Sequence, residues 1–571
     1  MKHLGKYIRP YWAFIALTLL IKTAGAYAEL LIPDLMEIMV DEKVPAGHGN
    51  SIYIYGGLML LCAALCLLCN ILANRMSAIS SGRITRAIRH DLFQKLEHLS
   101  ARQMDQLTVS SAESRLTSDT YNINQMLARL QRIGIRAPIL LLGGIFMMLR
   151  MDATLALVLV ALLPIIALVV YFVTKASLPL YTKQQTVLDK IVRTVQENIT
   201  GIRVIKALSK TDYEKDRFNR VNRELSAIGQ KAGTVSAITN PIASLVLNLG
   251  LTLVVLIGAF RVNDGQMKPG VILAFLQYFI MILNAMLGVT RIFVMWSKGE
   301  ASAKRVADVL QMPEDMAVLP GAEPQENPPH IEFSDVSFSY TGVGTNISHL
   351  NFRLEQGQTL GILGPTGSGK STILNLLMRI YDADTGTIRI HGQDIRSIPF
   401  SQLRSKFGIV FQNDFVMEGS IADNIRFFRD VDDDALAAAA QYAQAEFIAQ
   451  KEGGMDAEIQ VRGNNLSGGQ KQRLLIARAL AAKPEILVLD DASSALDYRT
   501  DAKLRQALRE HCQTTTILVA QRISSLRHAD LILVLHDGAV IGMGNHEALM
   551  ETCEEYAYLA RIQMGEGQEV G

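Results

Sequence analysis

Six long apolar stretches in the N-terminal half constrain the fold of this chain more than any other feature of its sequence. They lie at residues 12–40, 52–72, 135–150, 154–173, 235–260 and 271–296. About 20 apolar residues in a helix cross the ~30 Å core of a bilayer. Only 19% of the chain is charged, whereas about 25% is usual for soluble domains. The sequence therefore predicts six membrane-spanning helices.

Basic residues predict the orientation of these spans. The segments between the second and third spans and between the fourth and fifth are long and rich in Lys and Arg. Their basic residues include Arg83, Arg86, Arg89, Lys95, Arg102, Lys183, Lys190, Arg203, Lys206, Lys210, Lys215 and Arg217. Because Lys and Arg gather in cytoplasmic loops, we expect a multi-pass protein of the cytoplasmic membrane with its N-terminus and both long segments in the cytoplasm. Their helical periodicity predicts that the spans continue there as paired helices.

The remaining composition excludes several classes of function. A net charge of +1 provides no field that would favour nucleic acid. The five cysteines, three of them within one apolar stretch (Cys62, Cys66 and Cys69), predict neither a disulfide framework nor a zinc site. The apolar stretch nearest the N-terminus is too long for a cleaved signal peptide, so we expect it to remain as the first span.

A linker separates the membrane part from a second domain. Residues 311–330 are acidic, Pro-rich and only weakly periodic. Beyond them, short β-branched runs alternate with helical segments, which is typical of an α/β domain. We therefore expect an all-α transmembrane domain of six helices at 1–310, a linker at 311–330, and an α/β domain at 331–571.

The second domain contains a phosphate-binding loop. The stretch TLGILGPTGSGKST has the pattern G-x-x-x-x-G-K-S, between an apolar run and an amphipathic helix. Backbone N–H groups of such a loop point at phosphates, and the helix N-terminus adds partial positive charge. We expect Lys370 to reach the β- and γ-phosphates, and Ser371 and Asp490 to hold Mg²⁺. Residues 331–571 are therefore expected to form an α/β P-loop nucleotide-binding domain. The predicted ATP-binding residues of this loop are Gly364, Pro365, Thr366, Gly367, Ser368, Gly369, Lys370, Ser371 and Thr372.

A second motif resembles the characteristic motif of a known protein family. Residues 464–480, NNLSGGQKQRLLIARAL, together with the phosphate-binding loop, closely resemble the ATP-binding cassette (ABC) signature. Across its whole length the chain resembles a half-transporter of the bacterial multidrug-exporter branch, and in particular the degenerate subunit of heterodimeric exporters. The resemblance implies ATP-driven export of amphipathic small molecules, with ATP and Mg²⁺ as cofactors. It implies a second homologous half-transporter and membrane lipids as partners.

The resemblance also assigns roles to single residues. Tyr340 matches the aromatic residue that stacks on adenine, and Gln412 matches the Q-loop glutamine that senses Mg²⁺. The signature, which closes over ATP held by the partner chain, corresponds to Leu466, Ser467, Gly468, Gly469 and Gln470. The D-loop, which crosses the same interface, corresponds to Ser494, Ala495, Leu496 and Asp497. Segments around Asp119 and at 206–217 resemble the two regions that couple the membrane and nucleotide-binding domains.

Three places depart from the family pattern. The family usually has, after Asp490, the glutamate that orients the attacking water, but this chain has Asp491, which is one methylene shorter. Gln521 replaces the switch histidine and cannot carry an imidazolium charge. Gln460 and Val461 replace a Gly-Glu pair before the signature. We therefore expect a degenerate ATP site on this chain and a hydrolytic site on a partner, completed by this chain's signature.

Three alternatives remain at this stage. They are a lipid or peptide exporter of the same architecture, a regulatory subunit that binds ATP without pumping, and a slow homodimer that uses aspartate as its base. The substrate is not specified by the sequence. Polar residues inside the spans are functional candidates by default, and they include Lys22, Glu29, Asp34, Asn240, Asn248, Gln277, Asn284 and Arg291.

Overall fold

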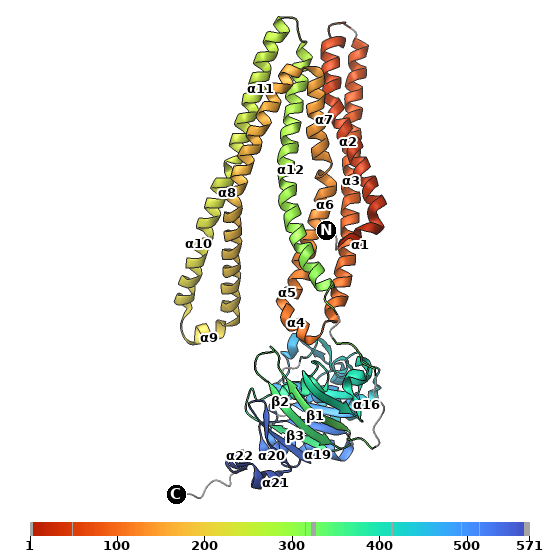
Figure 1. The fold of residues 1–571 in the computed structure, drawn as a ribbon, viewed down its shortest axis with the longest axis vertical. Helices are drawn as coiled ribbons and strands as arrows, with labels where there is room; N and C mark the ends of the chain where they lie inside the picture. The colour runs from red at the N-terminus through yellow and green to blue at the C-terminus, as the bar shows by residue number, and fades with distance from the viewer. Residues whose placement is uncertain are drawn as a thin grey trace. The chain divides into compact units, whose positions relative to one another are not determined.

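The structure of this chain is a computed structural model, shown in Figure 1. It describes residues 4–47, 49–313, 316–320, 327–412, 415–492, 494–512 and 514–564. The chain divides into two compact units. The helical unit comprises Met1–His98 and Val109–Met312, and the α/β unit comprises Leu99–Thr108 and Pro313–Gly571.

The helical unit consists of long helices joined by short turns (Figure 1). Its elements are α1 (Gly5–Ile8), η2 (Arg9–Tyr11), α2 (Trp12–Ile38), η3 (Met39–Lys43), α3 (Gly49–Glu97), α5 (Val109–Ser114), η4 (Arg115–Asp119), α6 (Thr120–Ile133), α7 (Arg136–Met151), α8 (Ala153–Thr200), α9 (Ile202–Ala207), α10 (Thr211–Ala237), α11 (Thr239–Asn263) and α12 (Pro269–Leu310). Among the described residues, six helical segments are long and apolar enough to cross a membrane: Gly5–Lys43, Gly49–Glu97, Val109–Met151, Ala153–Thr200, Ser244–Asn263 and Pro269–Met286. The six predicted spans are confirmed.

Two spans continue well beyond their apolar part. α3 has 49 residues and α8 has 48. At about 1.5 Å per residue each is about 70 Å long, more than twice the ~30 Å core of a bilayer. α8 runs beside α10, and the short α9 closes this helical hairpin (Figure 1). The paired helical extensions that the periodicity predicts are therefore present.

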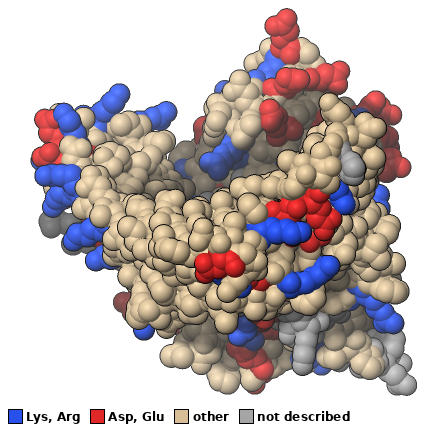
Figure 2. All heavy atoms as spheres, turned by 90° about the horizontal axis from the view of Figure 1, so that it is seen from above, with Lys and Arg blue, Asp and Glu red and all other residues tan. Residues whose placement is uncertain are grey.

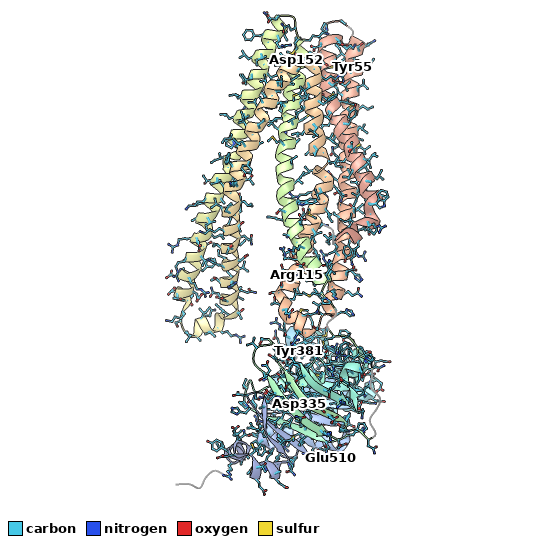
Figure 3. The ribbon with its side chains drawn as sticks, viewed as in Figure 1. Tyr55, Arg115, Asp152, Asp335, Tyr381 and Glu510 are labelled. Atoms are coloured by element: carbon cyan, nitrogen blue, oxygen red, sulfur yellow. The ribbon has the colours of Figure 1, made fainter. Side chains whose placement is uncertain are left out.

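Asp152 fixes the turn between α7 and α8. Its carboxylate accepts a hydrogen bond from the Leu155 N–H at 2.9 Å and so caps α8. It also forms an ion pair of 2.9 Å with Arg261 in the last turn of α11. Figure 3 shows Asp152 at the tip of the helices. The turn is thus held by a cap and by a contact with a neighbouring span.

Apolar side chains cover much of the outside of the helical unit. Leu60, Phe146, Leu245 and Phe260 leave between 66% and 73% of their surface exposed. Residues other than Lys, Arg, Asp and Glu make up most of the surface seen from above (Figure 2). Soluble monomers rarely expose contiguous apolar surface on this scale, so this is the surface of a protein that is immersed in lipid.

The α/β unit contains two main sheets and a short ribbon. A four-stranded antiparallel sheet has the order β2 (Ile347–Leu354), β1 (Ile331–Phe338), β4 (Thr385–Ile390) and β5 (Gln393–Asp394). A six-stranded core sheet has the order β12 (Ala539–Gly544), β11 (Leu531–His536), β3 (Thr359–Leu363), β10 (Thr515–Val519), β9 (Ile486–Asp490) and β6 (Phe407–Val410). β7 (Gly419–Ser420) pairs with β8 (Glu458–Ile459).

The described helices of this unit have at most 14 residues each. They are α4 (Ala101–Leu107), α13 (Lys370–Leu377), η5 (Ile395–Ser397), α14 (Phe400–Ser405), α15 (Ile421–Arg426), α16 (Asp433–Tyr442), α17 (Phe447–Gln450), η6 (Gly454–Asp456), η7 (Val461–Gly463), α18 (Gly468–Leu480), α19 (Tyr498–His511), α20 (Ile523–Leu526), α21 (His546–Thr552) and α22 (Glu554–Met564). All five residues of β9 are buried. Continuous apolar runs of this kind are typical of parallel strands that are covered on both faces.

Candidate functional site

Four neighbouring strands bring the predicted motifs to one edge of the core sheet. β3, β10, β9 and β6 are adjacent and parallel. The phosphate-binding loop follows β3, Gln521 follows β10, Asp490 ends β9, and Gln412 follows β6. Ligands of open α/β sheets bind at the carboxyl ends of the strands. Motifs that are far apart in the sequence therefore meet where a ligand is expected.

A cavity of about 270 Å³ lies at this edge. It is lined by Tyr340, Asn346, Thr366, Gly367, Gly369, Lys370, Ser371, Thr372, Gln412, Asp490, Asp491, Val519, Ala520 and Gln521. Gly364, Pro365 and Ser368 belong to the same loop but do not line the cavity. The structure thus brings together most of the predicted ATP-binding residues and both degenerate positions.

Two glycines determine the shape of the phosphate-binding loop. Gly367 and Gly369 have φ of +88° and +101°, a region that residues with a side chain rarely adopt. A Cβ on Gly369 would also lie 2.8 Å from the carbonyl oxygen of Asn346. Between the glycines, Ser368 has a buried Oγ with no hydrogen-bond partner among the described residues. Such an orphaned hydroxyl is unusual, and it fits a loop that is built to receive a polar ligand.

Lys370, Ser371 and Asp490 form the polar centre of the cavity. Lys370 Nζ donates to the carbonyl oxygens of Gly364 and Pro365, both at 2.8 Å. Ser371 Oγ donates to Asp490 Oδ2 at 2.9 Å. Burial lowers the pKa of Lys370 and raises the pKa of Asp490. Hydroxyl and carboxylate oxygens are the hard ligands that Mg²⁺ prefers, so Ser371 and Asp490 fit the predicted metal site.

Tyr340 lines the cavity with a ring that is held by its neighbours. Its ring centroid lies 4.8 Å from that of Phe338 and 5.0 Å from that of Tyr381, with interplanar angles of 86° and 89°. Its Oη donates to Thr372 Oγ1 at 3.3 Å. Edge-to-face contacts of this kind fix the orientation of a ring. The ring of Tyr340 is thus held at the cavity in a fixed orientation. Its stacking on the adenine of ATP stays a prediction.

Asp491 and Gln521 both line this cavity. Asp491 has φ +52°, a conformation that aspartate adopts more readily than most residues. Burial raises the pKa of Asp491, and the positive charges of Lys370 and Arg522 oppose this shift. Gln521 is exposed, and its carbonyl oxygen accepts a hydrogen bond from Gln563 Nε2 at 3.1 Å. The two departures from the family pattern therefore lie at one site.

The signature forms the exposed N-terminus of α18. Ser467 Oγ accepts from the Gln470 N–H at 3.3 Å, and Gln470 Oε1 accepts from the Ser467 N–H at 3.0 Å, which makes a capping box. Ser467 and Gly468 are exposed. Residues 466–470 do not line the cavity described above. The signature thus presents a positive helix end that lies outside the chain's own ATP cavity.

The D-loop lies against the signature. A Cβ on Gly469 would lie 3.2 Å from the carbonyl oxygen of Ala495. Ser494 and Ala495 are exposed, whereas Leu496 is buried. Asp497 caps α19 by accepting from the Thr500 N–H at 2.9 Å. The D-loop and the signature therefore form one exposed surface of this unit.

A short helix that the sequence does not single out packs within the α/β unit. This helix, α4, belongs to that unit, where Tyr381 Oη donates to Asp105 Oδ2 at 2.6 Å. Figure 3 shows Tyr381 at the end of the unit that carries α4. Asp119, the centre of the first predicted coupling region, instead lies inside the helical unit, where its Oδ2 is 2.9 Å from Arg305 Nε. The coupling role of the Asp119 segment stays a prediction.

Two further contacts hold α4. Arg102 pairs with Asp384 at 3.3 Å, and Gln103 Nε2 donates to the carbonyl oxygen of Pro313 at 2.7 Å. Ser100 caps the helix with a capping box. The second predicted coupling region, residues 206–217, lies on α9 and α10, and its coupling role stays a prediction.

Among the residues that sequence reasoning missed, one lines the ATP cavity and another lies at its border. Asn346 lines the cavity, and its Oδ1 accepts from the Tyr340 N–H at 3.0 Å. Gln563 lies on α22, and it contacts the segment that contains Gln521. Neither residue belongs to a recognisable motif, because each reaches the site through a tertiary contact.

Two of the polar side chains predicted inside the spans, Lys22 and Glu29, have polar partners. Lys22 Nζ donates to Asn70 Oδ1 at 2.6 Å and to Asn74 Oδ1 at 3.2 Å. Arg136 forms an ion pair of 2.7 Å with Glu29. The side chains of Asn240 and Arg291 lie outside the described residues. Lys22 and Glu29 thus have protein partners within the helical unit.

A six-span helical unit joined to an α/β unit with a phosphate-binding loop and a signature helix defines a half-transporter of the exporter type. The chain belongs to the ABC transporter family. Residues 15–286 match the family model described as ABC transporter transmembrane region, and residues 347–494 match the family model described as ABC transporter.

Relatives share this architecture over their full length. An uncharacterized ABC transporter ATP-binding protein of Mycobacterium tuberculosis is 32% identical, over 98% of this chain and 97% of the relative. The ATP-dependent lipid A-core flippase of Vibrio vulnificus is 28% identical, over 99% and 98%. The structure of a bacterial Atm1-family ABC exporter with ATP bound has a TM-score of 0.81 and 26% identity, and the match covers 98% of this chain and 99% of that one. The chain is therefore a multi-pass ABC exporter with an ABC ATPase domain.

Proposed function

We propose that this chain is the degenerate-site subunit of a heterodimeric ABC exporter that moves amphipathic small molecules across the cytoplasmic membrane. In this proposal its own phosphate-binding loop holds ATP and hydrolyses it slowly. Its signature completes the hydrolytic site of a homologous but different partner chain. Transport is then driven mainly by ATP at the partner's phosphate-binding loop.

The observation that carries the proposal is the meeting of Asp491 and Gln521 in one cavity beside a complete phosphate-binding loop. Aspartate is one methylene shorter than the usual glutamate, and a misplacement of about 1 Å can cost about 100-fold in rate. Glutamine cannot supply the charge of the usual histidine. Lys370 and Ser371 retain their binding chemistry. The changes therefore affect hydrolysis rather than ATP binding.

The residues of the cavity fit ATP and Mg²⁺. Bound Mg²⁺ supplies charge neutralisation at the phosphates. Ser371 Oγ and the Asp490 carboxylate provide its oxygen ligands, and Lys370 provides a positive charge at the loop. Tyr340 provides an aromatic face, and Gln412 provides a side-chain amide at the same cavity.

The exposed signature supports the proposal that this chain works with a partner chain. Its helix end is capped by Ser467 and Gln470, and it lies outside the chain's own ATP cavity. A regulatory subunit that only binds ATP has no use for such a surface, which disfavours that alternative. A homodimer would repeat Asp491 and Gln521 at both of its sites and would have no full hydrolytic site.

The experiment is to measure ATPase activity in lipid for the chain alone and for the chain produced together with its homologous partner. We expect little activity alone and robust activity in the pair. In the pair, Gly468→Asp should abolish turnover, because it adds a negative charge at the exposed signature, where a Cβ has room with Ala495 Cβ 3.8 Å away. Asp491→Asn should change turnover much less. Robust activity of the chain alone that is lost in Asp491→Asn would instead establish a homodimer with aspartate as its base.

A second candidate function is export of an anionic lipid. The specific observation is Lys22, which is only 4% exposed and whose two amide partners, Asn70 and Asn74, carry no charge to neutralise it. A buried cation inside a span is costly unless it serves a function or is paired. The relative from Vibrio vulnificus is named a lipid A-core flippase. Stimulation of the ATPase by anionic lipid, lost in Lys22→Gln, would favour this candidate over stimulation by uncharged or cationic amphiphiles.

A further inference from the structure

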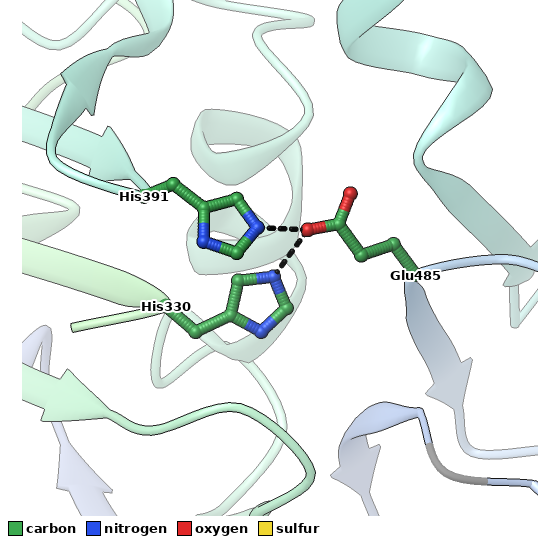
Figure 4. A group of neighbouring side chains, drawn as sticks. All are labelled: His330, His391 and Glu485. Atoms are coloured by element: carbon green, nitrogen blue, oxygen red, sulfur yellow. Dashed lines mark hydrogen bonds and ion pairs between the residues drawn. The ribbon is translucent and has the colours of Figure 1, made fainter. Parts of the chain in front are cut away.

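Three side chains meet at the end of β9 that lies away from the ATP cavity. His330 directly precedes β1, His391 lies in the turn between β4 and β5, and Glu485 directly precedes β9 (Figure 4). β1 and β4 belong to the antiparallel sheet, whereas β9 belongs to the core sheet. Asp490 stands at the opposite end of β9. The cluster is therefore separate from the ATP site, and it joins two sheets.

Both imidazoles contact the same carboxylate oxygen. His330 Nε2 lies 2.9 Å from Glu485 Oε1, and His391 Nε2 contacts that oxygen as well. The two rings are stacked, with centroids 4.4 Å apart and 27° between their planes. One ligand atom from each of the three residues lies within 4.8 Å of the others. Two nitrogens and one oxygen thus converge on one point, as Figure 4 shows.

Neighbouring groups hold the two most buried members of the cluster. Thr515 Oγ1 lies 2.5 Å from His330 Nδ1, and the Gly357 N–H donates to this hydroxyl at 2.9 Å. Metal-binding histidines usually have such a partner on their other ring nitrogen. Lys406 Nζ donates to Glu485 Oε2 at 2.6 Å, so Oε1 remains the oxygen that faces the imidazoles.

We propose that His330, His391 and Glu485 form a binding site for a divalent transition-metal ion of the Zn²⁺ class. Two imidazoles and one carboxylate are a known donor set for Zn²⁺. Bonds of about 2.0–2.2 Å place tetrahedral ligand atoms about 3.4 Å apart. The 2.9 Å separation of His330 Nε2 and Glu485 Oε1 has to open by a few tenths of an ångström. The side chain of His391 is 44% exposed, so it can adjust and leaves a path for the ion.

The ion links the antiparallel sheet to the core sheet. Its two histidines are carried by the ends of β1 and β4, and its carboxylate by the start of β9. A ligand that binds only the folded state stabilises that state. The stabilisation grows as the ligand concentration rises above the dissociation constant of the ligand. The site therefore makes the stability of the α/β unit depend on the metal without involving any ATP-binding residue.

The test uses the full-length chain in lipid nanodiscs, purified through a tag without histidine and freed of metal with a chelator. Co²⁺ is titrated with excess Mg²⁺ present, and visible absorption reports its coordination; Zn²⁺ is then added in competition. We expect one Co²⁺ per chain, displacement by Zn²⁺, and a higher unfolding temperature of the α/β unit with Zn²⁺. His391→Ala should weaken binding by about 100-fold or more, since even outer-shell changes cost 10–100-fold.

His349 provides a matched control. Its Nδ1 lies 2.7 Å from Asp335 Oδ1, and its side chain is 79% exposed, so it is a histidine–carboxylate pair in the same antiparallel sheet without a third ligand among the described residues. His349→Ala should bind Co²⁺ like the unaltered chain. Glu485→Gln is the second ligand variant, in case one substitution alters the fold. Equal binding by the unaltered chain and both ligand variants, or no Co²⁺ bound by the unaltered chain, would overturn the proposal.

Discussion

Gln563 of the C-terminal helix holds the backbone at Gln521. Its Nε2 donates to the Gln521 carbonyl oxygen at 3.1 Å, and its Oε1 accepts from the Ile523 N–H at 2.8 Å. A single amide side chain thus satisfies two main-chain groups of the segment that borders the ATP cavity. The position of Gln521 therefore depends on a helix that is remote from it in the sequence.

Loss of this contact should loosen the Gln521 segment. We expect Gln563→Ala to lower the free energy of unfolding of the α/β unit by about 1–2 kcal/mol, because two hydrogen bonds are lost, and to weaken ATP binding. Thermal unfolding and nucleotide titration measure the two effects. Gln506→Ala is the control, since Gln506 donates to Glu510 on an exposed face of α19 at 2.8 Å. Equal losses in both variants would contradict the prediction.

Lengthening the carboxylate at position 491 should restore hydrolysis. We expect Asp491→Glu to raise the ATPase rate of the chain alone by about 10-fold or more, because the extra methylene moves the carboxylate by about 1 Å toward the usual position of the base. Adding Gln521→His should raise it further. Phosphate release in lipid measures both rates. An unchanged or lower rate in the double variant would show that the shorter side chain is not what limits hydrolysis.

The buried carboxylate of Asp490 should lower the free energy of unfolding of the chain, although the ATP site needs this carboxylate. It is 4% exposed, and burial raises its pKa above the ordinary value of 3.8. The folded state then binds the proton more tightly than the unfolded chain, so stability falls as the pH rises from 3.8 through the raised pKa. At pH 7 without Mg²⁺, we expect Asp490→Asn to raise the free energy of unfolding by about 0.5–2 kcal/mol.

The same substitution should abolish Mg²⁺-dependent ATPase activity, because it removes the charged metal ligand. Thermal unfolding with a chelator present, from about pH 4 to about pH 8, tests the stability effect, because this range begins near the ordinary pKa of aspartate. The variant should also show the weaker pH dependence. Ser371→Ala, which removes the hydroxyl that donates to Asp490, serves as the comparison and should lower stability. If Asp490→Asn makes the chain less stable at every pH, the result would argue against a cost of burying this charge.

Tyr381 should hold α4 on the α/β unit through its hydroxyl. We expect Tyr381→Phe to increase hydrogen exchange of residues 101–107, because the 2.6 Å bond to Asp105 is lost, while ATP affinity stays unchanged. Hydrogen exchange read by mass spectrometry measures this directly. Tyr558→Phe is the control, since Tyr558 is 64% exposed on α22. If exchange of α4 is the same in both variants, the Arg102 and Gln103 contacts are sufficient without Tyr381.

Local patterns in the sequence determined much of this protein. The six spans follow from runs of apolar residues, because a bilayer imposes one length on any helix that crosses it. The extensions of α3 and α8 follow from helical periodicity that continues through segments with few turn residues. The phosphate-binding loop was also predictable, since Gly364 to Ser371 are contiguous and their spacing is itself the structural requirement.

Tertiary structure decided which distant residues meet. The order of β3, β10, β9 and β6 brings Asp491 and Gln521 into one cavity, and no spacing along the chain states that order. The fold also places Asp119 against Arg305, a partner that no motif around Asp119 indicates. His330, His391 and Glu485 are more than 60 and more than 90 residues apart along the chain, so only the packing of two sheets brings them together. The spacing of residues within a short motif can be read directly from the sequence. Contacts between side chains that are remote along the chain exist only once the chain has folded.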